Sequence, residues 1–96
     1  MLQQVTVRTD DRKTLKPLLR SAMENEKKMV LLGLERTRAR LAEFEQTYHL
    51  TSAEFERRLH TSEIAETVEF SEWRMETDKL RLLDRQYHDL EAAEQD

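Results

Sequence analysis

The chain has 96 residues, of which 38% are hydrophobic and 38% charged, with one glycine, one proline and no cysteine. The lack of cysteine excludes disulfides, thiol catalysis and cysteine metal sites, and so little glycine and proline is typical of long helices rather than of sheets. No run of about twenty apolar residues and no leader-like segment occurs, so we expect one cytoplasmic helical domain, 1–96, without a membrane span.

The first ten residues have the pattern of a short strand. Val5, Thr6, Val7 and Arg8 alternate apolar and polar side chains, and β-branched residues at period two favour an extended backbone. A lone strand has unpaired backbone groups. We therefore expect residues 1–10 to form a strand-like arm that pairs with another chain or stays frayed.

A long helix follows, for which we predict the range 14–48. Thr14 is a candidate N-cap, and Pro17 would then fall in the first turn, where its missing N–H costs nothing. Gly33 predicts the close approach of another helix. Apolar residues recur on one face at steps of three, four or seven, namely Leu15, Leu19, Met23, Val30, Leu34, Leu41, Phe44 and Tyr48. A helix of about 34 residues is about 50 Å long, so we expect an elongated molecule.

Two further helices are predicted after residue 50. Thr51 and Glu54 form a capping box, and Leu50 and Phe55 stand where a hydrophobic staple requires them, so a short helix is expected over 52–60. Residues 61–67 are a polar connection, and a second apolar stripe predicts a helix over 68–93. Its members are Trp73, Leu80, Leu83, Tyr87 and Leu90. The predicted fold is all-α: a long antiparallel helical hairpin with a short intervening helix and an N-terminal strand-like arm.

Charge is distributed unevenly along the chain. Residues 1–40 carry ten Lys or Arg and five acids, whereas residues 41–96 carry six Lys or Arg and fifteen acids. The basic part can meet an anion such as nucleic acid or an acidic protein. Alternatively, the two parts lie side by side and attract each other, and we favour this interpretation because a hairpin brings them together.

Few residues are arranged for chemistry. There is no glycine-rich phosphate loop, nucleophile elbow or paired-histidine zinc helix. Each histidine has an acid four residues earlier, in the pairs Glu45/His49, Glu56/His60 and Asp84/His88, and Glu91 extends the last pair. Such spacing suits a metal, but it also arises by chance in an acid-rich helix and stabilises exposed helices. We predict no enzyme activity, no catalytic or metal-binding residue, no cofactor and no small-molecule substrate.

Two sets of residues are candidates for partner binding. Trp73, Tyr87 and Leu90 would anchor a partner if exposed, although their helical spacing favours a place in the core. Arg8, Lys13 and Lys16 could instead bind nucleic acid. An elongated hairpin also leaves apolar edges uncovered at its ends, so we predict a homodimer.

One stretch carries a family resemblance. The run from Leu31 to Glu45, followed by Tyr48, the segment from Thr51 to Phe55 and the pair Glu72 and Trp73, resembles small all-helical prokaryotic proteins of unassigned function. Some of these resemble antitoxin components of toxin–antitoxin pairs. The resemblance implies a non-enzymatic protein-interaction module that binds a basic partner protein through a helical surface or its acidic C-terminal part.

The alternative function is a nucleic-acid-binding regulator that uses the basic N-terminal region. The segment Val5–Arg8 is similar to the opening strand of ribbon-helix-helix antitoxins. Those proteins need a turn between two short helices, and the chain departs from them because the segment from Ser21 to Met29 contains no Gly or Pro to make one.

Overall fold

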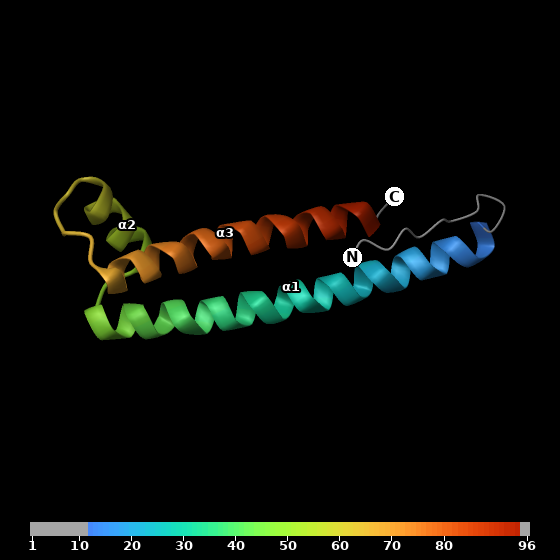
Figure 1. Ribbon diagram of the computed structural model, residues 1–96, viewed down its shortest axis with the longest axis horizontal. Coiled ribbons are helices and arrows are strands. Elements are labelled where there is room, and N and C mark those ends of the chain that lie inside the picture. Colours follow the sequence, from blue (N-terminus) through green and yellow to red (C-terminus); the bar gives the residue numbers. More distant parts are fainter. Residues whose placement is uncertain (1–11, 95–96) are drawn as a thin grey trace, which may run out of the picture.

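The computed structural model describes residues 12–94, so the strand-like arm expected over 1–10 lies outside the described residues. It contains three helices, α1 (Arg12–Tyr48), α2 (Ser52–His60) and α3 (Val68–Glu94). Figure 1 shows α1 and α3 lying side by side in opposite directions, with α2 at the end where the chain turns back. The predicted all-α hairpin with a short intervening helix is confirmed.

The molecule is elongated, as the predicted helix length requires. Its principal extents are 60 × 30 × 20 Å and its radius of gyration is 19.2 Å. A compact chain of this length would have a radius of gyration of about 12 Å. The two ends of the hairpin therefore have separate environments: a closed end, where the chain turns through α2, and an open end at the C-terminus of α3 (Figure 1).

The predicted start of α1 is wrong by two residues or more. α1 already includes Arg12, so Thr14 lies within the helix and is not its N-cap. Pro17 consequently sits beyond the first turn, where it removes one helical hydrogen bond. The freed carbonyl is that of Lys13, and the helix tolerates this loss because Lys13 is exposed, so water can reach the carbonyl.

At the closed end, the N-termini of α2 and α3 are capped by side-chain oxygens. The Thr51 hydroxyl accepts a hydrogen bond from the Glu54 N–H at 3.1 Å, which confirms Thr51 as the N-cap of α2, while the Glu54 carboxylate accepts from Arg57 and Arg58. The first N–H of α2, that of Ser52, donates to the Glu45 carboxylate at 2.6 Å, so α1 also caps α2. The predicted start of α3 is confirmed too, with Thr67 accepting from the Phe70 N–H at 3.1 Å.

Both sharp turns use non-glycine residues in the left-handed region. His49 follows α1 with φ 53°, and Ser62 follows α2 with φ 61°. The Leu50 N–H donates to the Glu45 carbonyl and the Glu63 N–H to the Arg58 carbonyl, as in Schellman motifs. The one glycine of the chain is used elsewhere, in the contact between the two long helices.

Gly33 lies where α1 and α3 approach each other closely. A Cβ added at this position would stand 3.2 Å from Cδ1 of Leu83, closer than side chains ordinarily pack. The prediction that Gly33 admits another helix is confirmed. The close approach brings oppositely charged side chains of the two helices together.

Three ion pairs join α1 to α3: Lys27 with Glu94 at 2.9 Å, Arg38 with Asp84 at 3.5 Å and Arg40 with Glu72 at 3.5 Å. The interpretation that the basic and acidic parts of the chain lie side by side is therefore confirmed. Such partly exposed pairs hold helices only weakly and serve mainly to orient them.

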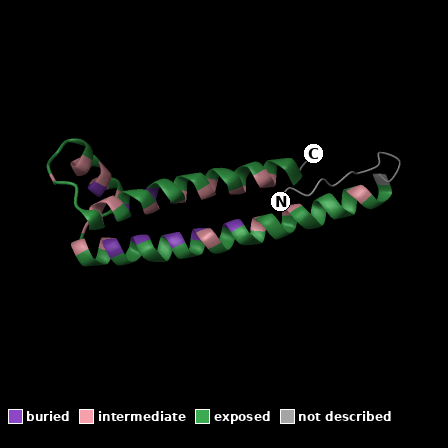
Figure 2. Ribbon diagram, in the orientation of Figure 1, coloured by how far each residue is buried: buried purple, intermediate pink, exposed green. Residues whose placement is uncertain are grey.

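The core lies at the closed end and is built around Trp73. Its indole ring is fully buried and stacks on Phe55 at 3.9 Å between ring centroids and on Phe44 at 5.4 Å. The indole N–H donates to the Ser52 hydroxyl at 2.9 Å. Trp73 thus connects α3 to both α1 and α2, and Figure 2 shows the buried positions of α1 facing α3.

The Thr37 hydroxyl is buried in the seam between the long helices without a hydrogen-bond partner among the described residues. Because valine has the same shape and no polar group, Thr37→Val is expected to raise the free energy of unfolding by about 1 kcal/mol. Urea denaturation measures this difference. The matched control is Thr77→Val, since the Thr77 hydroxyl donates to the Trp73 carbonyl at 3.0 Å and its removal should gain less. A loss of stability in Thr37→Val would contradict the prediction.

Candidate docking surface

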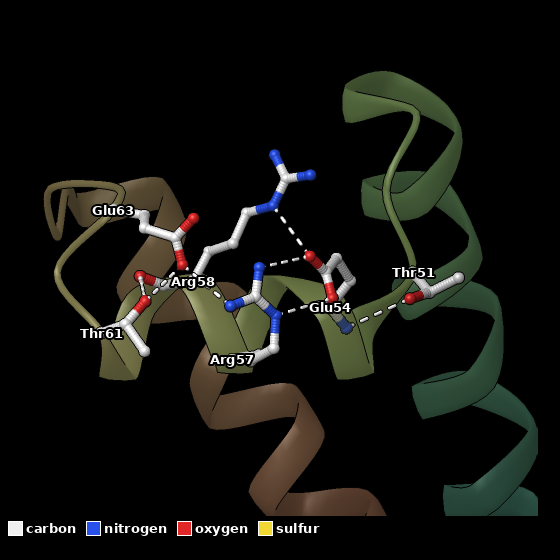
Figure 3. A network of polar contacts seen from close by, with 6 residues as sticks. All are labelled: Thr51, Glu54, Arg57, Arg58, Thr61 and Glu63. Carbon is white, nitrogen blue, oxygen red and sulfur yellow. Dashed lines mark hydrogen bonds and ion pairs between the residues drawn. The ribbon is translucent and has the colours of Figure 1, made fainter.

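The most extensive polar network surrounds α2 and has a structural role. Figure 3 shows the Glu54 carboxylate between the guanidinium groups of Arg57 and Arg58, which donate to it at 2.7 and 3.1 Å. These bonds lower the pKa of Glu54 to about 2. Arg57 continues the network by donating to Glu63 at 2.9 Å, and the Thr61 hydroxyl and Arg57 lower the pKa of Glu63. All these charges are engaged with one another, so they stabilise the turn and leave little for a ligand.

A groove of about 670 Å³ lies between α2 and α3, and it does not resemble a catalytic site. It is lined by Ala53, Glu56, Arg57, Leu59, His60, Glu66, Arg74 and Asp78. Its charges also neutralise each other, because Arg74 pairs with Glu66 at 2.8 Å and Glu56 pairs with Arg81 of α3. A groove of mixed and paired charge has no strong preference for an anion or a cation.

The acids next to the three histidines are occupied as well. Glu45 accepts from the Ser52 N–H, Glu56 pairs with Arg81, and Asp84 pairs with Arg38. Among the described residues, no group of three or more potential ligands is placed to hold a metal ion.

The predicted partner-binding residues separate in the structure. Trp73 is fully buried in the core at the closed end, so a partner cannot touch its ring in the folded hairpin, and the core interpretation applies to it. Tyr87 and Leu90 are half-buried towards the open end, and the Lys27 ammonium lies 5.6 Å from the centre of the Tyr87 ring. Of the nucleic-acid-binding candidates, Lys13 and Lys16 are exposed, whereas Arg8 lies outside the described residues.

At the open end, α1 extends beyond the end of α3, and its first turns are exposed. The Lys27–Glu94 pair marks the level where α3 stops, and residues 12–22 continue beyond it as an overhang (Figure 1). Here the predicted stripe loses its cover, and Leu19 is 53% exposed. A shallow groove of about 380 Å³ lies at this step, lined by Lys16, Leu19, Arg20, Met23, Glu24, Ala93 and Glu94.

Two carboxylates meet at this step. Hydrogen bonding and repulsion from Glu94 raise the pKa of Glu24. The Lys27 ammonium lowers the pKa of Glu94, which it contacts at 2.9 Å. The open end therefore combines exposed leucines with a crowded group of charges.

Two outward-facing apolar stripes were missed by the sequence analysis. On α3, Val68, Met75 and Leu82 follow one another at steps of seven and are 80%, 65% and 51% exposed. On α1, Leu18, Met29 and Leu32 point away from α3 and are 61%, 58% and 46% exposed. The signal that could have found the stripe on α3 is its seven-residue spacing, and the signal on α1 is the three-residue step from Met29 to Leu32. The stronger inward stripes obscured both.

The chain matches no protein-family model, and no curated protein and no solved structure shows significant similarity to it. None of the helices in the described residues is long and apolar enough to cross a membrane. The two outward stripes and the overhang are thus the surfaces from which a function can be inferred.

Glu54→Gln is expected to make the stability of the protein less sensitive to acid. The pKa of Glu54 is lower in the folded chain than its usual 4.5, so its stabilising effect is complete above pH 4.5 and is lost as the pH falls towards about 2. Urea denaturation across this pH range should give a shallower slope for the variant than for the wild type. Glu26→Gln is the control, because Glu26 makes no ion pair with another described residue, and it should keep the wild-type slope. Identical slopes for Glu54→Gln and the wild type would contradict the assignment.

Proposed function

We propose that the chain is a non-enzymatic, antitoxin-like protein-interaction module of the cytoplasm. In this proposal the chain forms a homodimer and binds a basic partner protein through a helical surface. The observation that carries the proposal is the outer face of α3. There Val68, Met75 and Leu82 form an exposed apolar stripe on a helix with eight acids and four basic residues.

A stripe of this kind suits an amphipathic basic segment. Apolar side chains at steps of seven provide anchors along one line of a helix, while surrounding carboxylates attract Lys and Arg of a partner and repel acidic proteins. Glu69, Glu72 and Asp78 are exposed on α3, and although Glu72 pairs with Arg40 and Asp78 with Arg81, these ion pairs are exposed, so a basic segment can exchange with them. The groove between α2 and α3 holds mutually paired charges, so the exposed stripe on the outer face of α3 is the better candidate for binding.

The test is affinity purification of the tagged full chain from its native host, followed by identification of the co-eluting protein. We expect a basic partner that is retained by the wild type and lost with Met75→Arg/Leu82→Arg, because this variant removes two anchors and places two positive charges on the face. Met29→Glu/Leu32→Glu, which changes equally exposed residues on α1, should retain the partner. Failure to capture a basic protein, or equal capture by all three chains, would refute this assignment of the surface.

The overhang supports a second candidate, binding of nucleic acid. Lys13, Lys16 and Arg20 are exposed together on the part of α1 that α3 does not cover, and clustered cations of this kind bind phosphates. If this function holds, a labelled oligonucleotide should bind with an affinity that falls steeply with salt, and Lys13→Ala/Lys16→Ala should weaken binding. An affinity that is unchanged in that variant, or that does not depend on salt concentration, would exclude nucleic-acid binding by the overhang.

A further inference from the structure

The outer face of α1 has the pattern of a coiled-coil seam. Six exposed residues follow one another at alternating steps of three and four, as the a and d positions of a heptad do. We call them the outer seam: Ala22, Asn25, Met29, Leu32, Arg36 and Ala39. Leu32 lies about half a helical turn from Val30 and Leu34, which are buried against α3. α1 therefore has one apolar seam covered by α3 and a second, mixed seam that faces away and has Met29 and Leu32 at its centre.

We propose that the outer seam pairs with the outer seam of a second copy of this chain, with the two α1 helices antiparallel and the two-fold axis between Met29 and Leu32. In this arrangement Met29 packs against the Leu32 position of the other copy, and Ala22 packs against the Ala39 position. Each contact occurs twice, as a two-fold interface requires. The inference specifies the homodimer named above and rests on that self-association, but not on the basic partner or its surface on α3.

The residues that flank the seam favour this register. Lys28 and Glu35 both occupy g positions, and in the antiparallel arrangement Lys28 of each copy faces Glu35 of the other. Both side chains are exposed, and neither makes an ion pair with another described residue. Two complementary pairs thus form across the axis, at positions where the single chain leaves both charges to solvent.

The polar members of the seam fit the same register. Asn25 meets Arg36 of the other copy, so the amide oxygen can accept from the guanidinium. A parallel pairing would instead place the two Arg36 side chains against each other, which is unfavourable. Two of the six layers are therefore polar, one on each side of the axis, and polar layers inside a seam are a known means of fixing orientation, at some cost in stability.

The charge distribution along α1 and the length of α1 also favour the antiparallel arrangement. Residues 12–28 carry six basic and two acidic side chains, whereas residues 29–48 carry three of each. Antiparallel packing keeps the two strongly basic segments apart, and parallel packing would join them. The axis near residue 30 also coincides with the midpoint of α1, Arg12–Tyr48, so the two helices overlap along their whole length.

The outer stripe of α3 is less suited to this pairing. Its exposed large apolar residues recur only every seven, at Val68, Met75 and Leu82, and the intervening positions Ser71 and Asp78 are polar. A seam with one apolar residue per heptad does not give the alternating layers that knobs-into-holes packing needs. It therefore serves as the control surface.

Sedimentation equilibrium of the full chain tests the proposal. We expect a dimer for the wild type, a monomer for Met29→Glu/Leu32→Glu, and an unchanged dimer for Met75→Arg/Leu82→Arg. Circular dichroism of each variant verifies that the helices are retained. A wild-type monomer, or a dimer lost only when the α3 stripe is changed, would overturn the proposal, whatever the outcome of the partner purification.

Charge exchange tests the register. Lys28→Glu and Glu35→Lys should each raise the dissociation constant on the order of tenfold, because like charges then face each other twice. The double variant K28E/E35K, and an equimolar mixture of the two single variants, should recover dimerisation. Single variants that dimerise like the wild type, or a double variant that remains as weak as either single variant, would refute the antiparallel register.

Cross-linking tests the orientation directly, since the sequence contains no cysteine. Ala22→Cys/Ala39→Cys should give a disulfide-linked dimer on mild oxidation, because the two positions face each other between copies. Each single cysteine variant should stay uncross-linked, since its own equivalent in the other copy is about 25 Å away. Ready cross-linking of Ala22→Cys alone would indicate parallel helices and contradict the proposal.

Discussion

The stacking of Trp73 against Phe55 and Phe44 is the contact on which the rest of the hairpin depends. One indole ring touches an aromatic side chain of each of the other two helices, and its N–H bonds to the first residue of α2. Burial of a large aromatic ring is the strongest apolar contribution that a chain of this composition can make. This cluster holds the three helices together at the closed end. The fraction of α1 that is buried falls from there towards the open end.

The unequal lengths of α1 and α3 follow from the same anchoring. Because both helices are joined at the closed end, the longer α1 must project at the open end. Gly33 allows α3 to lie close along the middle of α1, and the Lys27–Glu94 pair marks where this contact stops. Beyond it, the inward stripe of α1 continues without a partner among residues 12–94, and its leucines lie beside exposed cations.

The two outer faces differ in charge and in pattern, which is why we assign them different occupants. On each helix, the outer face lies about half a helical turn from the residues buried between α1 and α3. The two outer faces therefore point in opposite directions. The face of α1 has alternating heptad spacing with self-complementary charges, which suits a second copy. α3 as a whole carries more acids than basic residues, and its outer face has one apolar residue per heptad, so we propose for it a basic segment of another protein. A dimer through α1 would leave both α3 faces accessible.

The sequence by itself determined the helices, the α2 cap, the role of Gly33 and the pairing of basic with acidic halves, because these depend on local spacing and on the sign of charge. It named Tyr87 and Leu90 with Trp73 as candidate partner-binding residues on one stripe, and it overlooked Met29, Leu32, Met75 and Leu82. Only the tertiary structure decided which stripe is buried, because burial depends on where the chain turns and how far α3 reaches along α1. It also placed Trp73 in the core, since the ring that could anchor a partner is enclosed once α2 folds over it.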